Sequence, residues 1–299
     1  MSSEMETTAR IIASVTSAAF VFSSTNFFLN LYLIISIFVR KKVQRKVDFT
    51  LIYCRFAVDM LYSLDNTIYL IYMLIRMQFP KFVIKNLSFF IAWPNFNLGT
   101  MRCWLVFLIG LDRVLAVYTP ITYHNNRSKI PLFAIFLFIG SYALFEQYIL
   151  FVLCDFVLDV PLDCTVFRCA VNTCYHDYWK WYQQIMYSTI GLLSVILFFR
   201  LFIWNNCKKN NSKAIERATR ISLLDSVIIF AFDFFPVFLT AQWPQYNTKT
   251  VGPLGSLCKS FGFVIESTII CNVLLGFASK KIVPISQSQT SPTNFPVVY

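Results

Sequence analysis

Apolar residues form seven long runs along the chain, and short polar segments separate them. A helix rises about 1.5 Å per residue, so about 20 mostly apolar residues cross the ~30 Å hydrocarbon core of a membrane. The runs lack the alternating ten-residue pattern of a membrane β-strand. We therefore predict an all-α membrane protein, a bundle of seven transmembrane helices in a single domain covering residues 1–299. The predicted spans are 11–39, 49–75, 87–118, 131–153, 183–204, 221–241 and 254–277, followed by a tail at 278–299.

Basic residues are unevenly distributed between the two sets of alternate loops. Fourteen Lys and Arg follow the first, third, fifth and seventh runs, whereas seven lie on the other side. Because basic residues gather on the cytoplasmic side of membrane proteins, we expect an extracellular N-terminus and a cytoplasmic C-terminus. The net charge of +11 is then a topology signal, with attraction to anionic membrane lipid, and it implies no nucleic-acid partner.

Composition argues against a soluble enzyme. The chain is 57% hydrophobic and only 14% charged, which lies outside the range of soluble domains. It has two histidines, and we find no His/Cys/Asp metal spacing, P-loop or nucleophile motif. We therefore expect no enzymatic activity, no metal and no cofactor.

Four of the nine cysteines fall in one loop on the predicted outer side, at Cys154, Cys164, Cys169 and Cys174. The extracellular side is oxidising, so we expect two disulfides within this loop. Spacing alone leaves all three pairings open, and a Cys-rich metal knuckle is the competing interpretation.

The third run ends in a motif that carries charge. Asp112 and Arg113 stand where the apolar residues give way, in LIGLDRVLAVYTPITYHNNR. Basic groups favour helix C-termini and inner membrane surfaces, so the pair also has an ordinary structural explanation. With seven spans and an external N-terminus, however, this motif resembles the rhodopsin-like G-protein-coupled receptors.

The sequence resembles one receptor family more closely, the nematode chemoreceptors called serpentine receptor class BC. The resemblance is carried by the motif at 112–127, the cysteine loop at 154–179 and the segment RKKVQRKVDFTLIYCRFAVD at 40–59. It extends from about residue 11 to residue 277. It implies a chemosensory receptor that detects a small environmental or pheromone-like molecule and activates a heterotrimeric G protein. It also implies a plasma-membrane location in the sensory cilia of chemosensory neurons, and a receptor oligomer is a further option.

The resemblance assigns Arg113 as the G-protein switch. In the resting state it would be held by Asp112 and by an acid at the inner end of the sixth span, for which Glu216 is the candidate. The alternative is that Glu216 pairs with Arg220, one turn away on the same helix. Pro236 is expected to kink the sixth span, and the resemblance makes Phe234 and Pro236 the activation hinge.

Charged residues inside a bilayer are costly and require partners. By resemblance, Asn30, Asp59 and Asn272 belong to an internal polar network of the bundle. Arg102 lies on the helix face of Arg113, because 11 residues correspond to about three turns. We therefore predict an internal Asp59–Arg102 ion pair, with Arg55 as the competing partner of Asp59.

The resemblance places a ligand at the outer halves of the third, fifth, sixth and seventh spans. The pocket would be apolar with few polar anchors. The candidate residues are Asp65, Asn95, Phe96, Gly99, Glu146, Gln147, Tyr187, Phe234, Gln242, Trp243 and Glu266.

The sequence departs from the superfamily at several positions. The cysteine usual at the outer end of the third span is absent, so the cysteine loop must close on itself, and the Asn-Pro-x-x-Tyr motif is reduced to residues 272–276. Two other classes remain as alternatives. A ligand-gated channel of the insect odorant-receptor type has an internal N-terminus, against the loop charges, and a transporter with charged residues at the midplane would favour inverted repeats, which we do not detect.

Overall fold

The computed structural model describes residues 3–41, 49–79, 81–127, 131–162, 164, 167–207, 223–224, 227–236 and 250–280. Every regular element in this part of the chain is a helix, as expected of an all-α protein. Three are short π-helical segments (η), in which the backbone hydrogen bond spans one residue more than in an α-helix. The elements are α1 (Ser3–Ile34), η1 (Ile35–Val39), α2 (Thr50–Gln78), α3 (Leu87–Tyr118), α4 (Pro120–Arg127), α5 (Leu132–Tyr148), η3 (Ile149–Leu153), α6 (Phe167–Ala170), α7 (Thr173–Cys207), η4 (Ile229–Phe234) and α10 (Leu254–Lys280).

Most helices coincide with the apolar runs. α3 has the predicted limits, and α5 with η3 covers the predicted 131–153 within one residue. α7 is the main difference, because it begins at Thr173, ten residues before the predicted 183. Of the predicted span 221–241, only residues 223–224 and 227–236 are described.

Four described helices are long and apolar enough to cross a membrane. They occupy Glu6–Val39, Phe133–Leu153, Thr173–Arg200 and Leu254–Leu274. α2 and α3, of 29 and 32 residues, are equally long but carry buried charges.

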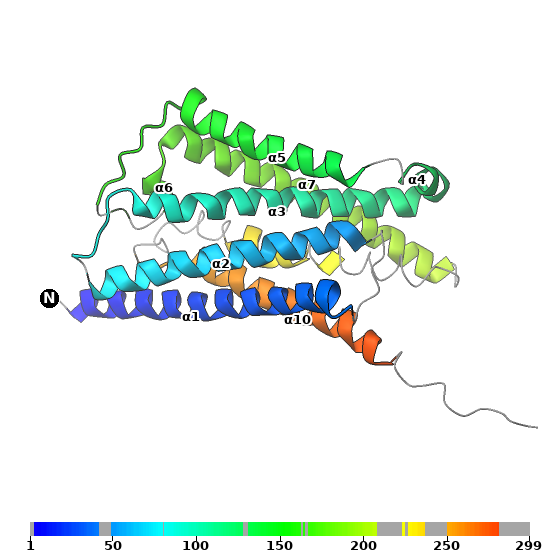
Figure 1. Cartoon of the computed structure of the whole chain (residues 1–299), viewed down its shortest axis with the longest axis horizontal. Coiled ribbons are helices and arrows are strands. Elements are labelled where there is room, and N and C mark those ends of the chain that lie inside the picture. Colours follow the sequence, from blue (N-terminus) through cyan, green and yellow to red (C-terminus); the bar gives the residue numbers. More distant parts are fainter. Residues whose placement is uncertain are drawn as a thin grey trace, which may run out of the picture.

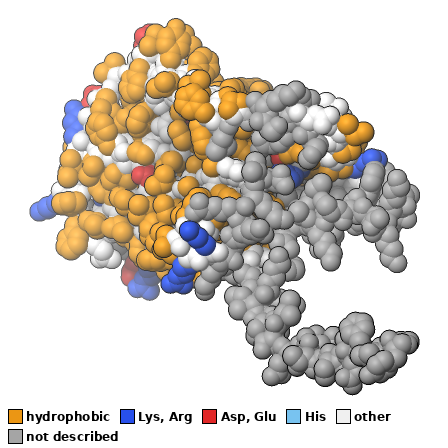
Figure 2. Space-filling view, turned by 45° about the vertical axis from the view of Figure 1, so that its right-hand side comes forward, with side chains coloured by type: hydrophobic (Ala, Val, Ile, Leu, Met, Phe, Trp, Pro, Cys, Tyr) orange, Lys and Arg blue, Asp and Glu red, His pale blue; other side chains and the backbone are white. Residues whose placement is uncertain are grey.

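The long helices pack side by side around α3 and α2 (Figure 1). α1 lies against α2 and α10, α2 against α3, and α3 against α7. Hydrophobic side chains cover much of the surface seen in Figure 2, with basic groups towards its margins. α5 illustrates this surface, since Phe133 and Leu144 are 73% and 72% exposed. Such a surface suits contact with lipid rather than with water.

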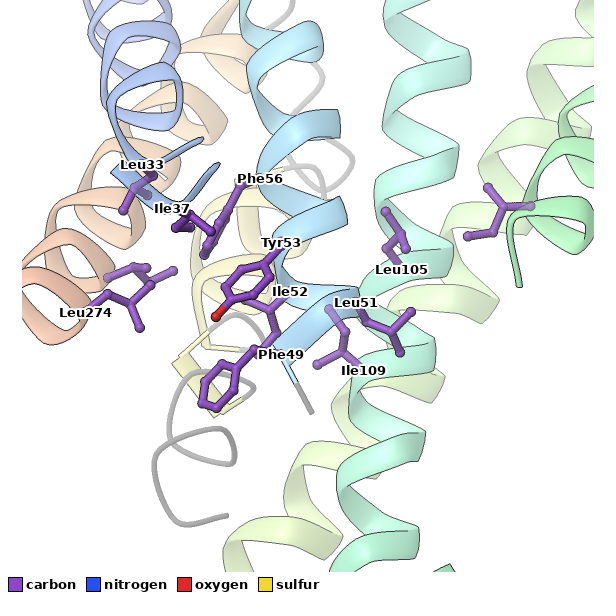
Figure 3. Close-up of a cluster of buried hydrophobic side chains, with 12 residues drawn as sticks. Leu33, Ile37, Phe49, Leu51, Ile52, Tyr53, Phe56, Leu105, Ile109 and Leu274 are labelled. Carbon is purple, nitrogen blue, oxygen red and sulfur yellow. The ribbon is translucent and has the colours of Figure 1, made fainter. Parts of the chain in front are cut away.

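The largest hydrophobic core joins α1, α2, α3 and α10 (Figure 3). Leu33, Phe56, Ile109 and Leu274, one from each of these helices, belong to it and are at most 4% exposed. This packing holds α2, α3 and α10, which carry the charge cluster described below, against one another and against α1.

Candidate functional site

A cavity of about 350 Å³ lies between α2, α3, α7 and α10. Sites for small molecules typically have volumes of ~300–1,000 Å³. Each helix contributes one stripe at helical spacing, such as Trp179, Tyr182, Gln183 and Tyr187 on α7. The other lining residues are Tyr62, Asn66, Tyr69, Ala92, Asn95, Phe96, Gly99, Thr100, Cys103, Pro253, Gly255, Ser256 and Lys259.

The cavity wall combines aromatic and polar groups. On the side of α3 and α7, Phe96 meets Trp179 edge to face with ring centroids 4.9 Å apart, beside the polar side chains of Asn95, Thr100 and Gln183. On the side of α2 and α10, Asn66, Ser256 and Lys259 present polar groups beside the rings of Tyr62 and Tyr69. An apolar chamber with a few polar anchors is therefore present among the described residues, in the form that the sequence predicts for a ligand site.

Four residues predicted from the sequence to contact a ligand line this cavity, namely Asn95, Phe96, Gly99 and Tyr187. Gly99 leaves room there, because a Cβ atom at this position would come no closer than 3.7 Å, to Cε2 of Tyr62. Gln242 and Trp243 lie outside the described residues.

Five other predicted ligand residues do not line the cavity: Asp65, Glu146, Gln147, Phe234 and Glu266. Glu146, only 1% exposed, instead accepts a hydrogen bond from Thr100, Oγ1 to Oε1 3.1 Å. Gln147 donates to Asn97 over 2.7 Å. These side chains support the α3 wall from behind, because the register of α5 turns them towards α3 rather than into the cavity.

Several lining residues were missed, above all Trp179 and Tyr182, which were placed in or near a loop. α7 starts early because the side chain of Asn172 accepts a hydrogen bond from the backbone N–H of Tyr175, 3.0 Å, at the helix N-terminus. The aromatic spacing of Tyr175, Tyr178, Trp179 and Tyr182 is helical and could have revealed this turn.

Four charged side chains meet in the interior, and we call Arg55, Asp59, Arg102 and Glu266 the charge tetrad. All four are at most 3% exposed. Arg102 Nε lies 2.8 Å from Asp59 Oδ1, and Arg55 Nε lies 3.3 Å from Asp59 Oδ2, so the predicted pair and its competitor coexist. Glu266 completes the tetrad, since it pairs with Arg55 through Oε1 and with Arg102 through Oε2 over 3.0 Å. The tetrad is electrically neutral and connects α2, α3 and α10.

The sequence misplaced Glu266 in the ligand site. The direction in which its side chain points depends on how α10 is rotated against α2 and α3. Spacing in the sequence does not fix this rotation. The ring of Phe263, one turn before Glu266, lies 3.9 Å from Arg102 Cζ and 5.7 Å from Lys259 Nζ. Phe263 therefore contacts one cation of the cavity wall and one cation of the charge tetrad.

A second, uncharged network connects α1, α2 and α10. Asn30 donates to Asn26 Oδ1 over 2.9 Å and to Ser267 Oγ over 3.1 Å, and Asn26 donates to Ser63 over 2.6 Å. The prediction for Asn272 is wrong, because its side chain is exposed. It lies five residues after Ser267, about 140° around the helix, and therefore faces away from this network.

The C-terminal end of α3, away from the cavity, carries the Asp112 and Arg113 pair. Arg113 Nη2 lies 2.6 Å from Asp112 Oδ2, and Arg113 is 3% exposed. The hydroxyl of Tyr123, on α4, donates to Asp112 Oδ1 over 3.0 Å. Glu216, the other predicted partner of Arg113, lies outside the described residues.

The predicted hinge lies at a local change in helix geometry. η4 ends at Phe234, and Pro236 follows in a further helical turn. Proline lacks a backbone N–H and its ring collides with the carbonyl four residues earlier, and a wider helical turn relieves such a collision. α10 packs closely against this segment, because a Cβ atom at Gly262 would lie 2.7 Å from Cβ of Phe232.

The cysteine loop closes on itself with two disulfides, Cys154–Cys174 and Cys164–Cys169. This pairing resolves the three options left by the sequence. Arg76, near the end of α2, donates to the carbonyl oxygens of Cys164 and Leu162 over 2.6 and 2.7 Å. The loop is therefore anchored to the end of the bundle at which α2 ends and α7 begins.

Comparison with known families gives one match that spans almost the whole chain. Residues 8–277 match the family described as Serpentine type 7TM GPCR chemoreceptor Srbc. No curated protein is significantly similar to the chain. Together with the long apolar helices, the family match identifies a membrane protein of a receptor family. The resemblance noted in the sequence is confirmed, and the chain belongs to the Srbc family of serpentine chemoreceptors.

Proposed function

We propose that the chain is a seven-span chemosensory receptor that binds a small molecule in the cavity and activates a heterotrimeric G protein through Arg113. One observation carries the proposal: the cavity and Arg113 lie on the same continuous helix. Gly99 and Thr100 of α3 line the cavity, and Arg113 follows 14 residues after Gly99, about 21 Å along the axis. Arg102, between them, belongs to the charge tetrad.

The proposed topology puts the N-terminus outside and the C-terminus in the cytoplasm. The distribution of basic residues supports this orientation, as do the two disulfides, which need an oxidising compartment. The cavity then opens in the outer half of the bundle, and Asp112 and Arg113 meet the G protein. We also propose a location in the plasma membrane, in sensory cilia, which the family membership supports.

The resting state is proposed to hold Arg113 through Asp112. The short Arg113–Asp112 contact and the Tyr123 hydroxyl support this arrangement. The carboxylate of Asp112 is held in position by both donors, so it can keep Arg113 in place. Release of Arg113 would create a cationic contact for the G protein. Glu216 remains a predicted second partner, and the Phe234–Pro236 hinge a predicted moving part.

The first test uses an epitope tag before Met1 in intact and permeabilised cells. Staining of intact cells is expected. Staining only after permeabilisation, with normal surface delivery, would contradict the topology and favour an inverted channel.

The second test measures G-protein activation by a panel of small molecules. Arg113→Ala should abolish activation while surface expression persists. Arg40→Ala removes an exposed arginine on the same predicted side and serves as the control. Signalling retained by Arg113→Ala would refute the switch assignment.

A further inference from the structure

Lys259 is the only residue with a formal charge among the described residues that line the cavity. Resting on the receptor function proposed above, we propose that the cavity binds an amphiphile with a carboxylate head group. The carboxylate contacts Lys259, and the apolar body lies against the aromatic wall of α3 and α7.

The ammonium group of Lys259 is positioned by aromatic rings. Its Nζ lies 4.9 Å from the ring centroid of Tyr62, which itself lines the cavity, and 5.7 Å from that of Phe263. Contacts of this kind attract a cation and hold the partly buried ammonium at the cavity wall. An anion in the cavity would add the stronger ion-pair contribution.

Neutral hydrogen-bonding groups surround Lys259 on the same wall. Ser256, one turn earlier on α10, donates to Asn66 Oδ1 over 3.2 Å. The amide nitrogen of Asn66 donates to Ser23 over 3.0 Å, so the side chain is held in place from α1. Because their donors are already used within the protein, these groups present acceptor oxygens, which can bind a hydroxyl of the ligand, while Lys259 supplies the donor for the carboxylate.

The number and type of cationic groups select the anion. Phosphate recognition in proteins commonly uses the bidentate fork of arginine or several donors converging on one group. Here one compact ammonium and neutral partners meet the head group, which suits a single negative charge. An amine would meet a like charge at Lys259, whereas a neutral head group would leave the ion pair unformed.

The remainder of the cavity suits an apolar body. Phe96 and Trp179 form an edge-to-face pair, Tyr187 adds a further ring, and the small residues Ala92 and Gly99 line the same cavity. A fully polar anion would not bury apolar surface there. The combination of one cation with an aromatic chamber therefore selects an amphiphilic carboxylate.

The test compares decanoic acid, 1-decanol and decylamine, which share a chain and differ in head-group charge. Binding to the purified full-length receptor in nanodiscs is measured near pH 7.4 by thermal shift and by quenching of tryptophan fluorescence. We expect decanoic acid to bind about tenfold more tightly than decanol, and decylamine to bind most weakly.

Variants at Lys259 assign this preference to one group. Lys259→Gln should reduce the preference for the acid to less than about twofold, and Lys259→Glu should reverse it in favour of decylamine. Lys259→Arg keeps the charge and should retain the preference, which separates charge from packing. Lys180→Gln is the matched control, because Lys180 follows Trp179 in sequence but is exposed and does not line the cavity.

Gly99→Leu, which fills the cavity, distinguishes failure of this inference from failure of the proposed ligand site. If acid and alcohol bind equally and Gly99→Leu blocks both, the cavity is a ligand site but its preference for an anion is refuted. If acid binding survives Lys259→Gln unchanged, the inference is also refuted. If Gly99→Leu blocks no probe, or no probe binds the folded receptor, both the inference and the cavity assignment fail.

Discussion

Arg102 on α3 and Glu266 on α10 lie 3.0 Å apart, Nη2 to Oε2, although 164 residues separate them in the sequence. Both side chains are nearly fully buried, and each has a second partner in the charge tetrad. The contact connects the helix that carries Arg113 to the helix that carries Lys259. The stability of the receptor is therefore expected to depend on keeping the tetrad neutral.

Glu266→Gln should destabilise the receptor by about 3–5 kcal/mol, because it leaves a buried positive charge without compensation. The double variant Arg102→Met/Glu266→Gln should lose less than Glu266→Gln alone, since the Arg55–Asp59 pair remains neutral. Unfolding of the purified receptor in detergent gives both values. Losses that simply add would contradict a coupled tetrad.

The exposed pair Lys85–Asp159 is the control for that cycle. Its atoms lie 2.9 Å apart, but the two side chains are 64% and 73% exposed. Water screens such a pair, so Lys85→Met/Asp159→Asn should show a coupling of no more than about 1 kcal/mol.

Gly262→Ala should destabilise the packing of α10 against η4. The added methyl group would lie 2.7 Å from Cβ of Phe232, and such overpacking costs about 1–3 kcal/mol. Gly255→Ala, on the same helix, has no atom within 4 Å of the new Cβ and should be neutral or slightly stabilising. The midpoints of thermal unfolding distinguish the two, and equal midpoints would refute the close packing.

The two disulfides should differ in their contribution to stability. Cys154–Cys174 closes a sequence separation of 20 and Cys164–Cys169 one of 5. By loop entropy alone they are worth about 3 and about 2 kcal/mol. The Cys154→Ser/Cys174→Ser variant should therefore unfold at the lower temperature. Peptide mapping without reduction checks the pairing, and peptides joining Cys154 to Cys164 would contradict it.

Tyr123→Phe should raise ligand-independent G-protein activation, given the switch role proposed for Arg113. The change removes the hydroxyl that donates to Asp112 Oδ1. A hydrogen bond to a charged group contributes about 1.5 kcal/mol or more, equivalent to roughly tenfold in a two-state population. Tyr118→Phe is the control, because its hydroxyl has only a 3.5 Å contact, to the carbonyl of Ile196. Unchanged basal activity in Tyr123→Phe would exclude Tyr123 from the switch.

The membrane helices could be predicted from sequence because their signal is local. Apolar length alone predicts α3 at its observed limits of Leu87 and Tyr118. It missed the first ten residues of α7, where His176, Asp177 and Lys180 interrupt the apolar pattern. This first part of α7 is held by tertiary contacts, including the disulfide at Cys174, and a hydropathy pattern does not detect such contacts.

The site was only partly predictable because it depends on how the helices are rotated. Asn95, Phe96 and Gly99, three of the predicted ligand residues, line the cavity together because they share one face of one helix. Lys259 lines the cavity and Glu266 does not, and neither position could be predicted, because both depend on the orientation of α10 relative to α2 and α3. Asn272 was assigned by analogy with a motif that the sequence only partly retains.

Phe263 has a mechanical consequence for α10. Its ring contacts the ammonium of Lys259 and the guanidinium of Arg102, and the neighbouring Gly262 packs against Phe232. Residues 259–266 span only two helical turns, about 11 Å. The cavity wall and the charge tetrad therefore share one short stretch of α10, and any displacement of this stretch would change both of them at once.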